Sequence, residues 1–403
     1  LLNVCEGRRV VLLDRFDVDE WVNAVREHRP RAVSLVPTAL RMVLEADVEP
    51  DDLSSIEVVT SGSAPLDPGV QRAFEARYDL AVLPSYGATE FAGGVAGWTL
   101  PPRLSVSDWA DQYRRLSKKG AAESGQWRTD RTPYLREIMD CLSPHDPTRR
   151  VVFMKGAQIG GTEAGNNWLG YVVHLVPGPM MVVQSTVDTA ERWSKQRIAS
   201  MIEEMPVLRE RIAPARSRDS GNTTLLKEYP GGVLVIAGAN SAAGLRSMPV
   251  KYLFLDEVDS YPDDLDGEGD PITLAERRTA TFAKSKIFIV STPTVKDASR
   301  IEREYEASDQ RRYHVPCPDC GGKQWLKWAN LRWEDDRPET AKYACEHCGS
   351  LIEERHKTRM LEQGEWIMGN PQSKVAGFHI SSLYSPLGLG DPWAALVEKY
   401  LEA

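Results

Sequence analysis

The residues of this chain that are best suited to catalysis are two adjacent carboxylates, Asp256 and Glu257. They follow the apolar run 252–255, which predicts a buried strand. A buried strand that ends in two carboxylates is the Walker B pattern, in which the first carboxylate holds Mg²⁺ and the second orients and deprotonates a water beside a terminal phosphate. We therefore predict that Asp256 is a Mg²⁺ ligand and that Glu257 is the catalytic base. The alternative is a strand that ends in a solvated acidic turn, because further aspartates follow closely.

A glycine-rich turn upstream could hold the phosphates of ATP. The general phosphate-loop pattern is G-x-x-x-x-G-K-[ST] between a strand and a helix. Aligned on Gly160 and Thr162, Gly161 stands where lysine is usual and Lys155 stands where the first glycine is usual. A lysine at the start of the loop can still reach the phosphates, because its stem is long and flexible. The alternative is a glycine-rich turn without a ligand. The predicted nucleotide-binding residues are Lys155, Gly156, Ala157, Gln158, Gly160, Gly161 and Thr162, with Lys155 also counted as catalytic and the Thr162 hydroxyl as a second Mg²⁺ ligand.

Four further residues are candidates for the same site. Ser291 and Thr292 follow the apolar run 287–290, and their hydrogen bonds could change when a terminal phosphate is lost. A helix cap or a turn explains these two residues equally well. Arg246 could meet a phosphate in this subunit or the next, or lie on the surface. Tyr134, upstream of the glycine-rich turn, could stack on adenine or belong to the core.

Cysteines occur in two C-x-x-C pairs, Cys317 with Cys320 and Cys345 with Cys348. Two such pairs complete a tetrahedral Zn²⁺ site, so we predict a structural zinc ribbon in preference to a redox pair. His347 is a conceivable substitute ligand. The other two of the six cysteines, Cys5 and Cys141, stand alone, which suits a reducing compartment better than a disulfide framework.

These side chains must be positioned by an α/β scaffold. Apolar runs at 180–183, 233–237, 252–255 and 287–290 alternate with helical patterns, chiefly 187–204 and 271–283. Runs that are apolar on both faces predict a mostly parallel sheet covered on both sides. A nucleotide binds such a sheet at the carboxyl ends of its strands, where the loops after residues 154, 255 and 290 should converge.

Composition limits the partners and the compartment. The chain has 49 Lys and Arg against 58 Asp and Glu, so any contact with nucleic acid must come from a local patch or from other subunits. No apolar run is long enough for a membrane helix, and the N-terminus carries no signal pattern. We expect a soluble, cytoplasmic protein that does not bind membranes.

The first 97 residues are a separate α/β segment, with strands expected at 9–13, 32–37 and 56–60 and helices at 19–28 and 68–78. Its turns TSGSAPL (60–66) and YGATE (86–90) resemble consecutive motifs of the adenylate-forming, or acyl-CoA synthetase, family. The resemblance implies that Tyr86 lies by the base and that Thr89 and Glu90 lie by phosphate and metal. The family's phosphate loop, hinge and C-terminal lysine regions are missing, so we interpret the segment as an inactive or accidental fusion fragment. An acyl-adenylating ligase is the rival hypothesis for the chain's function.

From about residue 101 the chain resembles the large terminase subunit of tailed phages, specifically the GpA-type family of lambda-like packaging motors. The matching motifs are, in order, TPYLREIMD, MKGAQIGGTEAGNNW, GANSAAGLRS, YLFLDEVDSYP, STPT, VPCPDCG, YACEHCG, GEW and LYSP. The displaced lysine fits this family's variant phosphate loop. The resemblance implies a RecA-like ATPase that drives double-stranded DNA into a procapsid in the host cytoplasm. Its partners would be DNA, the small terminase subunit, the portal and, when assembled, further copies of itself.

These resemblances suggest four regions. They are an adenylate-forming fragment at 1–98, a terminase-type ATPase at 99–310, a zinc ribbon at 311–357 and, at 358–403, the start of a linker towards a nuclease domain. Nuclease activity is not expected from these residues. A third hypothesis is a zinc-ribbon interaction module on an inactive ATPase scaffold, because position 161 lacks the usual lysine.

Overall fold

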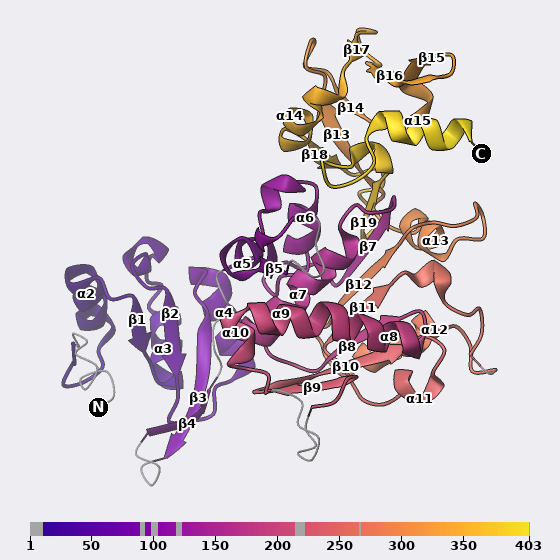
Figure 1. The fold of residues 1–403 in the computed structure, drawn as a ribbon. Helices are drawn as coiled ribbons and strands as arrows, with labels where there is room; N and C mark the ends of the chain where they lie inside the picture. The colour runs from indigo at the N-terminus through magenta and orange to yellow at the C-terminus, as the bar shows by residue number, and fades with distance from the viewer. Residues whose placement is uncertain are drawn as a thin grey trace. The chain divides into compact units, whose positions relative to one another are not determined.

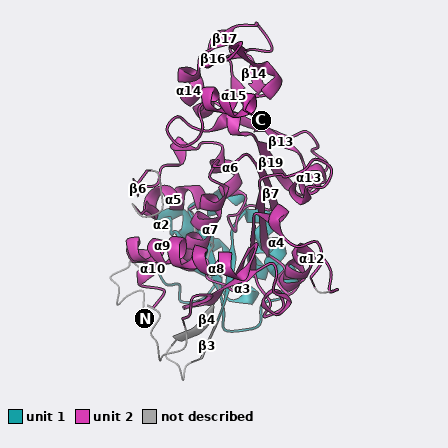
Figure 2. Cartoon of the chain, turned by 45° about the vertical axis from the view of Figure 1, so that its right-hand side comes forward, with its two compact units in different colours: residues 1–101 teal, residues 102–403 magenta. Residues whose placement is uncertain are grey.

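The chain divides into two compact units, Leu1–Pro101 and Pro102–Ala403 (Figure 2). The computed structural model describes residues 11–88, 93–97, 104–117, 123–213, 222–265 and 267–402. Each unit has its own sheet and its own apolar core. All the candidate residues of the predicted ATPase site and zinc site belong to the second unit.

The first unit is a four-stranded sheet with helices packed on it. Its strands are, in order across the sheet, β1 (Ala32–Ser34), β2 (Val58–Ser61), β3 (Val82–Ala88) and β4 (Gly93–Gly97), the first three being parallel. Its helices are α2 (Val18–His28), α3 (Pro37–Glu45) and α4 (Pro68–Tyr78). Helix α4 has the predicted bounds and begins at Asp67, whose carboxylate accepts from the backbone N–H groups of Gly69 and Val70.

Parts of the first unit differ from expectation. Residues 11–13 form no strand, so the strand predicted at 9–13 is wrong over its described part. Helix α3 is not predicted, and the β-type run expected at 32–37 is a strand only to Ser34, since Pro37 begins α3. The backbone of Tyr86 lies in β3, whereas Thr89 and Glu90 lie outside the described residues.

The second unit is built on one large, mostly parallel sheet (Figure 1). Its strands are, in order across the sheet, β14 (Lys323–Trp325), β13 (Arg311–Pro316), β19 (Ala376–Ile380), β7 (Arg150–Lys155), β12 (Lys286–Ser291), β11 (Tyr252–Asp256), β8 (Met180–Gln184), β10 (Gly232–Gly238) and β9 (Leu226–Tyr229), with β18 (Glu365–Ile367) paired to β13. Every neighbouring pair from β13 to β10 is parallel, and the outer pairs are antiparallel. The predicted α/β class with a mostly parallel sheet is confirmed.

Helices cover both faces of this sheet. Along β7, Val151 and Phe153 join one apolar core while Val152 and Met154 join the other, because successive side chains of a strand point to opposite faces. The first core is completed by α5 (Val106–Tyr113), α6 (Leu135–Asp140), α7 (Gly161–Leu175), α9 (Ala199–Glu204) and α10 (Pro206–Arg209). The second is completed by α11 (Ala242–Leu245), α12 (Pro271–Glu276) and α13 (Arg300–Glu306).

The helix predicted at 187–204 contains a local irregularity. It consists of α8 (Val187–Trp193), a π-helical turn at Ser194–Ile198, and α9. A π turn inserts an extra residue into the hydrogen-bond ladder, and such turns are frequent at functional sites. Periodicity in sequence predicts the helix but does not reveal the turn.

The C-terminal part of the chain returns to the sheet. Strand β19 lies between β13 and β7 and pairs in parallel with both, although residues 358–403 were interpreted as the start of a linker. The remaining elements are a three-stranded sheet of β15 (Leu331–Glu334), β16 (Arg337–Ala344) and β17 (Leu351–Ile352), with α14 (Lys357–Glu362) and α15 (Trp393–Leu401). Strands β14 and β16 lie between the two cysteine pairs.

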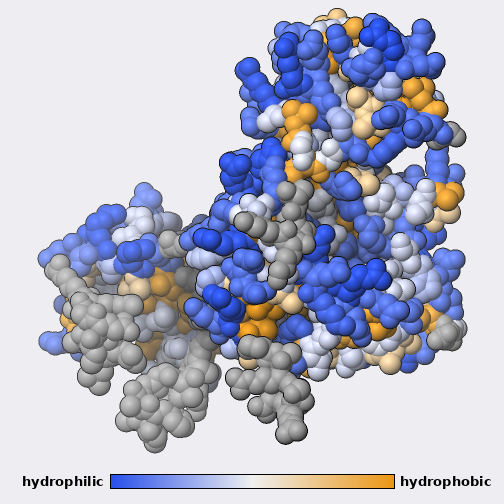
Figure 3. Space-filling view, in the orientation of Figure 1, coloured by the Kyte–Doolittle hydropathy of each residue, from blue (hydrophilic) through white to orange (hydrophobic). Residues whose placement is uncertain are grey.

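The surface of the second unit is largely hydrophilic in the view of Figure 3, with small, scattered hydrophobic patches. Among the described residues, no helix combines the length and the apolar character that crossing a membrane requires. Most of the large apolar side chains of this unit fill the two cores of the sheet, although a few, such as Val295 and Leu351, are exposed.

Candidate active site and metal centre

The carboxyl ends of three neighbouring strands bring the predicted catalytic residues together. Lys155 ends β7, Asp256 ends β11, and β12 lies between these two strands. The Lys155 ammonium donates to Glu257 Oε1 at 2.7 Å and to Thr292 Oγ1 at 3.0 Å. Only 6% of the Lys155 side chain is exposed, whereas 39% of the Glu257 side chain is, so the ammonium is the shielded member of this ion pair.

Glu257 is held in an unusual backbone conformation. Its φ of 54° lies in the left-handed region, which is uncommon for residues with a Cβ and is often found at functional sites. The backbone N–H of Thr292 donates to Glu257 Oε2 at 3.2 Å, and the hydroxyl of Ser291 lies 3.4 Å from the same oxygen. Ser291 and Thr292 therefore contact Glu257 from the end of the adjacent strand.

Asp256 is a buried carboxylate for which the described residues provide no ion-pair partner. The Thr162 hydroxyl lies 3.2 Å from both of its carboxylate oxygens, and Gln184 Nε2 donates to Oδ2 at 3.1 Å. Burial raises the pKa of Asp256 to about 6, although these hydrogen bonds act in the opposite direction. A buried carboxylate beside a hydroxyl fits a divalent cation, which would supply the missing positive charge.

The glycine-rich turn has the shape of a phosphate-binding loop. It connects β7 to α7, and Gly160 enters the helix with a φ of 89°, which glycine adopts without strain. A Cβ built on Gly161 would lie 2.7 Å from both Cδ and Cε of Lys155 and 2.7 Å from Val290 Cγ1. The stem of Lys155 therefore occupies the space that a side chain at position 161 would need.

The turn opens into a cavity of about 980 Å³. The predicted residues that line it are Tyr134, Lys155, Gln158, Gly160, Gly161, Thr162, Asp256 and Glu257. Ser291 and Thr292 lie behind Glu257 and Lys155, and Gly156 and Ala157 are not in the wall either. Gly156 packs against Ser382 instead, whose backbone nitrogen would be 2.5 Å from a Cβ at 156.

Two of the predicted residues are placed differently from the rest. Arg246 forms an ion pair with Glu268 and does not line the cavity, so the structure does not bring it to the phosphate loop of its own chain. Tyr134 is fully buried, and its hydroxyl donates to the carbonyl of Ile159 at 3.2 Å. This hydrogen bond holds the glycine-rich turn in place. Stacking of Tyr134 on adenine stays a prediction.

Sequence reasoning missed the cations on the cavity walls. Arg128 and Arg131 lie on one wall, and Arg192 and Arg197 lie on another, carried by α8 and the π turn. One helical face supplies the second wall, because the lining residues recur every three or four positions: Thr189, Arg192, Trp193, Gln196 and Arg197. This spacing of polar and cationic residues is visible in the sequence. Two of these guanidinium groups pair with carboxylates that line the same cavity: Arg131 contacts Glu123, and Arg197 contacts Glu163. The cavity walls therefore carry charges of both signs.

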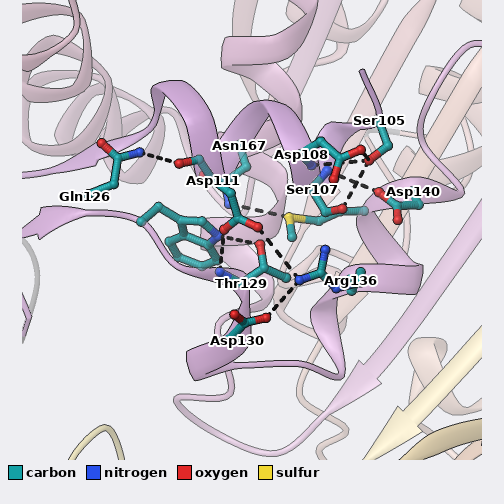
Figure 4. Close-up of polar contacts among 12 residues, drawn as sticks. Ser105, Ser107, Asp108, Asp111, Gln126, Thr129, Asp130, Arg136, Asp140 and Asn167 are labelled. Atoms are coloured by element: carbon teal, nitrogen blue, oxygen red, sulfur yellow. Dashed lines mark hydrogen bonds and ion pairs between the residues drawn. The ribbon is translucent and has the colours of Figure 1, made fainter. Parts of the chain in front are cut away.

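A polar network fixes the wall that carries Arg128. This wall adjoins the hairpin of β5 (Arg115–Leu116) and β6 (Gly125–Gln126). Asp111 accepts from the backbone N–H of Thr129 at 2.6 Å, and Arg136 bridges Asp130 and Asp111 at 2.9 and 3.8 Å (Figure 4). The Thr129 hydroxyl also accepts from Trp127 Nε1 at 3.0 Å. The network ties the wall to α5 and α6.

His379, on the neighbouring strand β19, contacts the end of β7 that leads into the glycine-rich turn. Its Nδ1 lies 3.2 Å from the carbonyl of Met154, so Nδ1 must carry the proton that is donated. Burial, and then the nearby Arg312, lower the pKa of His379 to about 4. The folded protein therefore keeps this imidazole neutral at pH values where the unfolded chain protonates it.

This shift predicts a loss of stability in mild acid. Since the pKa is lowered, the unfolded state binds more protons below pH 6.5, and unfolding free energy should fall by about 2 kcal/mol from pH 7.5 to pH 5 through this group alone. The variant His379→Gln keeps a donor for the Met154 carbonyl and has no group that titrates. Its midpoint of urea unfolding should therefore fall less than that of the wild type between pH 7.5 and pH 5. His145→Gln, at an exposed site, is the control. Equal pH dependence in wild type and His379→Gln would contradict the prediction.

The four paired cysteines form the second candidate site. Their sulfur atoms all lie within 4.8 Å of one another, with Cys317 and Cys348 at 3.9 Å and Cys320 and Cys345 at 3.8 Å. A Zn–S bond of about 2.3 Å gives a tetrahedral S–S edge of about 3.8 Å, so these spacings fit one zinc ion.

The surroundings of the cysteines also suit a metal. Gly321 and Gly349, each following the second cysteine of a pair, have φ values of 75° and 73°, which lets both turns curl back on the sulfur atoms. The His347 ring contacts the Lys323 carbonyl at 3.0 Å, so it is engaged away from the sulfur atoms. The residues therefore fit a four-thiolate zinc site.

Comparison with known proteins finds two family models that match parts of the chain. Residues 121–366 match the family model described as phage terminase large subunit gpA, ATPase domain, and residues 1–117 match that of AMP-binding enzyme. Both resemblances predicted from the motifs are confirmed.

Individual relatives show how much is shared. The terminase large subunit of Enterobacteria phage P21 is 29% identical over 345 residues, which is 78% of this chain and 52% of that protein. The terminase large subunit of Escherichia phage lambda is 26% identical over 328 residues, which is 75% of this chain and 50% of that protein. The chain thus spans about half the length of these relatives. The 4-coumarate–CoA ligase 3 of Oryza sativa subsp. japonica is 36% identical over 96 residues, 23% of this chain and 17% of that enzyme.

Proposed function

Because this chain belongs to the family of the phage terminase large subunit gpA ATPase domain, we propose that it is an ATP-hydrolysing motor of phage DNA packaging. The observation that carries the proposal is the convergence of Lys155, Thr162, Asp256 and Glu257 on one cavity. These residues come from a phosphate-type loop and from the end of a central strand, as in RecA-like ATPases.

The contacts between these residues support a mechanism for hydrolysis. Lys155 neutralises Glu257 through a contact of 2.7 Å. A terminal phosphate draws the ammonium towards itself, which frees the Glu257 carboxylate to accept a proton from the attacking water. Asp256 and the Thr162 hydroxyl would hold Mg²⁺, which neutralises charge on the phosphates. Thr292 contacts both Lys155 and Glu257, so it is placed to respond when this pair separates.

The proposed substrate and partners follow from the two relatives, both of which are terminase large subunits. We propose that hydrolysis drives double-stranded DNA into a procapsid in the host cytoplasm. The partners would be the small terminase subunit, the portal and further copies of this chain. Since the chain is acidic overall, DNA contacts would come from a local basic patch or from an assembled ring.

The test is ATP hydrolysis by the purified chain. We expect turnover that requires Mg²⁺ and that rises on addition of double-stranded DNA and procapsids. Nucleotide binding without hydrolysis, even with DNA and portal present, would favour an inactive scaffold carrying a zinc-ribbon interaction module. Release of pyrophosphate from ATP with a carboxylic acid substrate would favour the ligase hypothesis, and we expect none.

The zinc site is proposed as a structural ribbon. Cys317 directly follows β13, and the Tyr384 hydroxyl donates to the carbonyl of Tyr313 in that strand and accepts from Leu326 N–H, both at 2.6 Å. The cysteines are thus joined to the same sheet that carries Lys155. Loss of the metal should therefore loosen one edge of the sheet.

This proposal predicts the behaviour of cysteine variants. The purified protein should contain about one zinc per chain by elemental analysis, because four thiolates complete the coordination of one ion. Cys345→Ser should lose most of it and lower the melting temperature by several degrees. Cys141→Ala is the matched control, since Cys141 is also buried but lies outside the cluster. Metal-free wild-type protein with an unchanged melting temperature would contradict a structural zinc.

A further inference from the structure

The side-chain amide of Gln184 contacts Asp256, and the proposed mechanism gives it no role. Gln184 is the last residue of β8, and its backbone is fixed by pairing with Gly238 and by a 2.7 Å hydrogen bond from Ala239 N–H to its carbonyl. Only 5% of the residue is exposed, yet it lines the cavity. A buried amide at this position must be satisfied by specific partners.

The contact of Gln184 with Asp256 has a defined direction. An ionised carboxylate only accepts, so the 3.1 Å hydrogen bond must run from Gln184 Nε2 to Asp256 Oδ2. The Thr162 hydroxyl is equally far, 3.2 Å, from both carboxylate oxygens and cannot select between them. Gln184 is therefore the group that sets the rotation of this carboxylate and leaves Oδ1 for another partner.

The amide type also matters. A lysine at this position would place a positive charge where a cation is expected, and a glutamate would repel Asp256. Glutamine donates without adding charge, and among the described residues no donor reaches its Oε1. That oxygen is available to accept from a water of a hydrated Mg²⁺ ion, which usually keeps several of its waters.

We propose that Gln184 is a positioning residue for the Mg²⁺ ligand Asp256, orienting the carboxylate through Nε2 and holding a metal-bound water through Oε1. The inference rests on the proposed function, because it assumes that Asp256 receives Mg²⁺ with a nucleotide. Partners that orient a metal ligand commonly change metal affinity by ten- to a hundredfold when they are removed. A purely structural tie between β8 and β11 would affect stability alone.

The experiment separates these two roles by measuring metal binding directly. Mn²⁺ is titrated into the full chain with saturating adenylyl imidodiphosphate, an ATP analogue that resists hydrolysis, and free Mn²⁺ is counted by electron paramagnetic resonance. The variants are Gln184→Met, which removes the amide at similar length, and Gln184→Asn, which keeps the amide but shortens its reach. Gln324→Met is the matched control, since Gln324 is a 2% exposed glutamine on β14 of the same sheet.

We expect Mn²⁺ to bind at least tenfold more weakly to both Gln184 variants and unchanged to Gln324→Met. In the presence of EDTA, the affinity of all three variants for the ATP analogue should stay within twofold of the wild-type affinity. Equal Mn²⁺ affinity in wild type and either folded Gln184 variant would overturn the inference while leaving the proposed function intact. Wild-type protein that binds neither the analogue nor Mn²⁺ would overturn the proposed function and this inference with it.

Discussion

Glu257→Gln should lower the rate of ATP hydrolysis at least a hundredfold while ATP still binds. The amide cannot accept the proton of the attacking water, and loss of a positioned base typically costs about 10²–10⁴ in rate. Its oxygen can still accept from the backbone N–H of Thr292, so the turn should keep its shape. Phosphate release under saturating ATP and Mg²⁺ measures the rate, and equilibrium binding of a fluorescent ATP analogue measures affinity.

Glu268→Gln provides the control for this experiment. Glu268 is a partly exposed carboxylate in an ion pair with Arg246, and it does not line the cavity. Its variant should hydrolyse ATP at the wild-type rate within about twofold, as expected for a surface substitution. Turnover by Glu257→Gln close to that of the wild type would refute the assignment of Glu257 as the base.

Lys155→Ala should abolish measurable ATP hydrolysis and also weaken ATP binding. Lys155 is the last residue of β7, at the carboxyl edge of the sheet. Its buried ammonium contacts Glu257 and Thr292. Without it, Glu257 is left without its ion-pair partner and the phosphates lose a charge-assisted contact. Single-turnover hydrolysis and ATP binding report the two effects separately.

Because truncation of a buried lysine also leaves a void, Lys155→Met should be measured beside it. Methionine fills similar volume without a charge, so a shared loss of activity isolates the role of the ammonium. Lys195→Ala, on the exposed side of the π turn, is the control and should stay active. Normal hydrolysis by Lys155→Ala would disprove the relocated-lysine account even though the family membership stands.

The sequence predicted those parts of the site that follow from local patterns. The runs that became β8, β11 and β12 are apolar on both faces, which predicts central parallel strands. The ends of such strands share one edge, so the meeting of Lys155 with Glu257 could be expected.

Other parts of the site depend on contacts that no local pattern encodes. Strand β19 pairs with β7, which lies more than two hundred residues upstream, so no hairpin signal marks it. The role of Gln184 depends on its contact with Asp256, which the neighbouring strand β11 carries. The π turn at Ser194–Ile198 changes a hydrogen-bond ladder without changing the apolar spacing that predicts a helix.

The crowding at Gly161 has a consequence for how this loop can change during evolution. Moving the lysine to the usual position takes two substitutions, one at 155 and one at 161. If Gly161→Lys comes first, the Cβ of the new side chain lies 2.7 Å from Cδ and Cε of Lys155 and from Cγ1 of Val290. If Lys155 is lost first, the loop passes through a form with no lysine at all. We expect both intermediates to be impaired, so that neither order of single substitutions moves the lysine without a loss of activity.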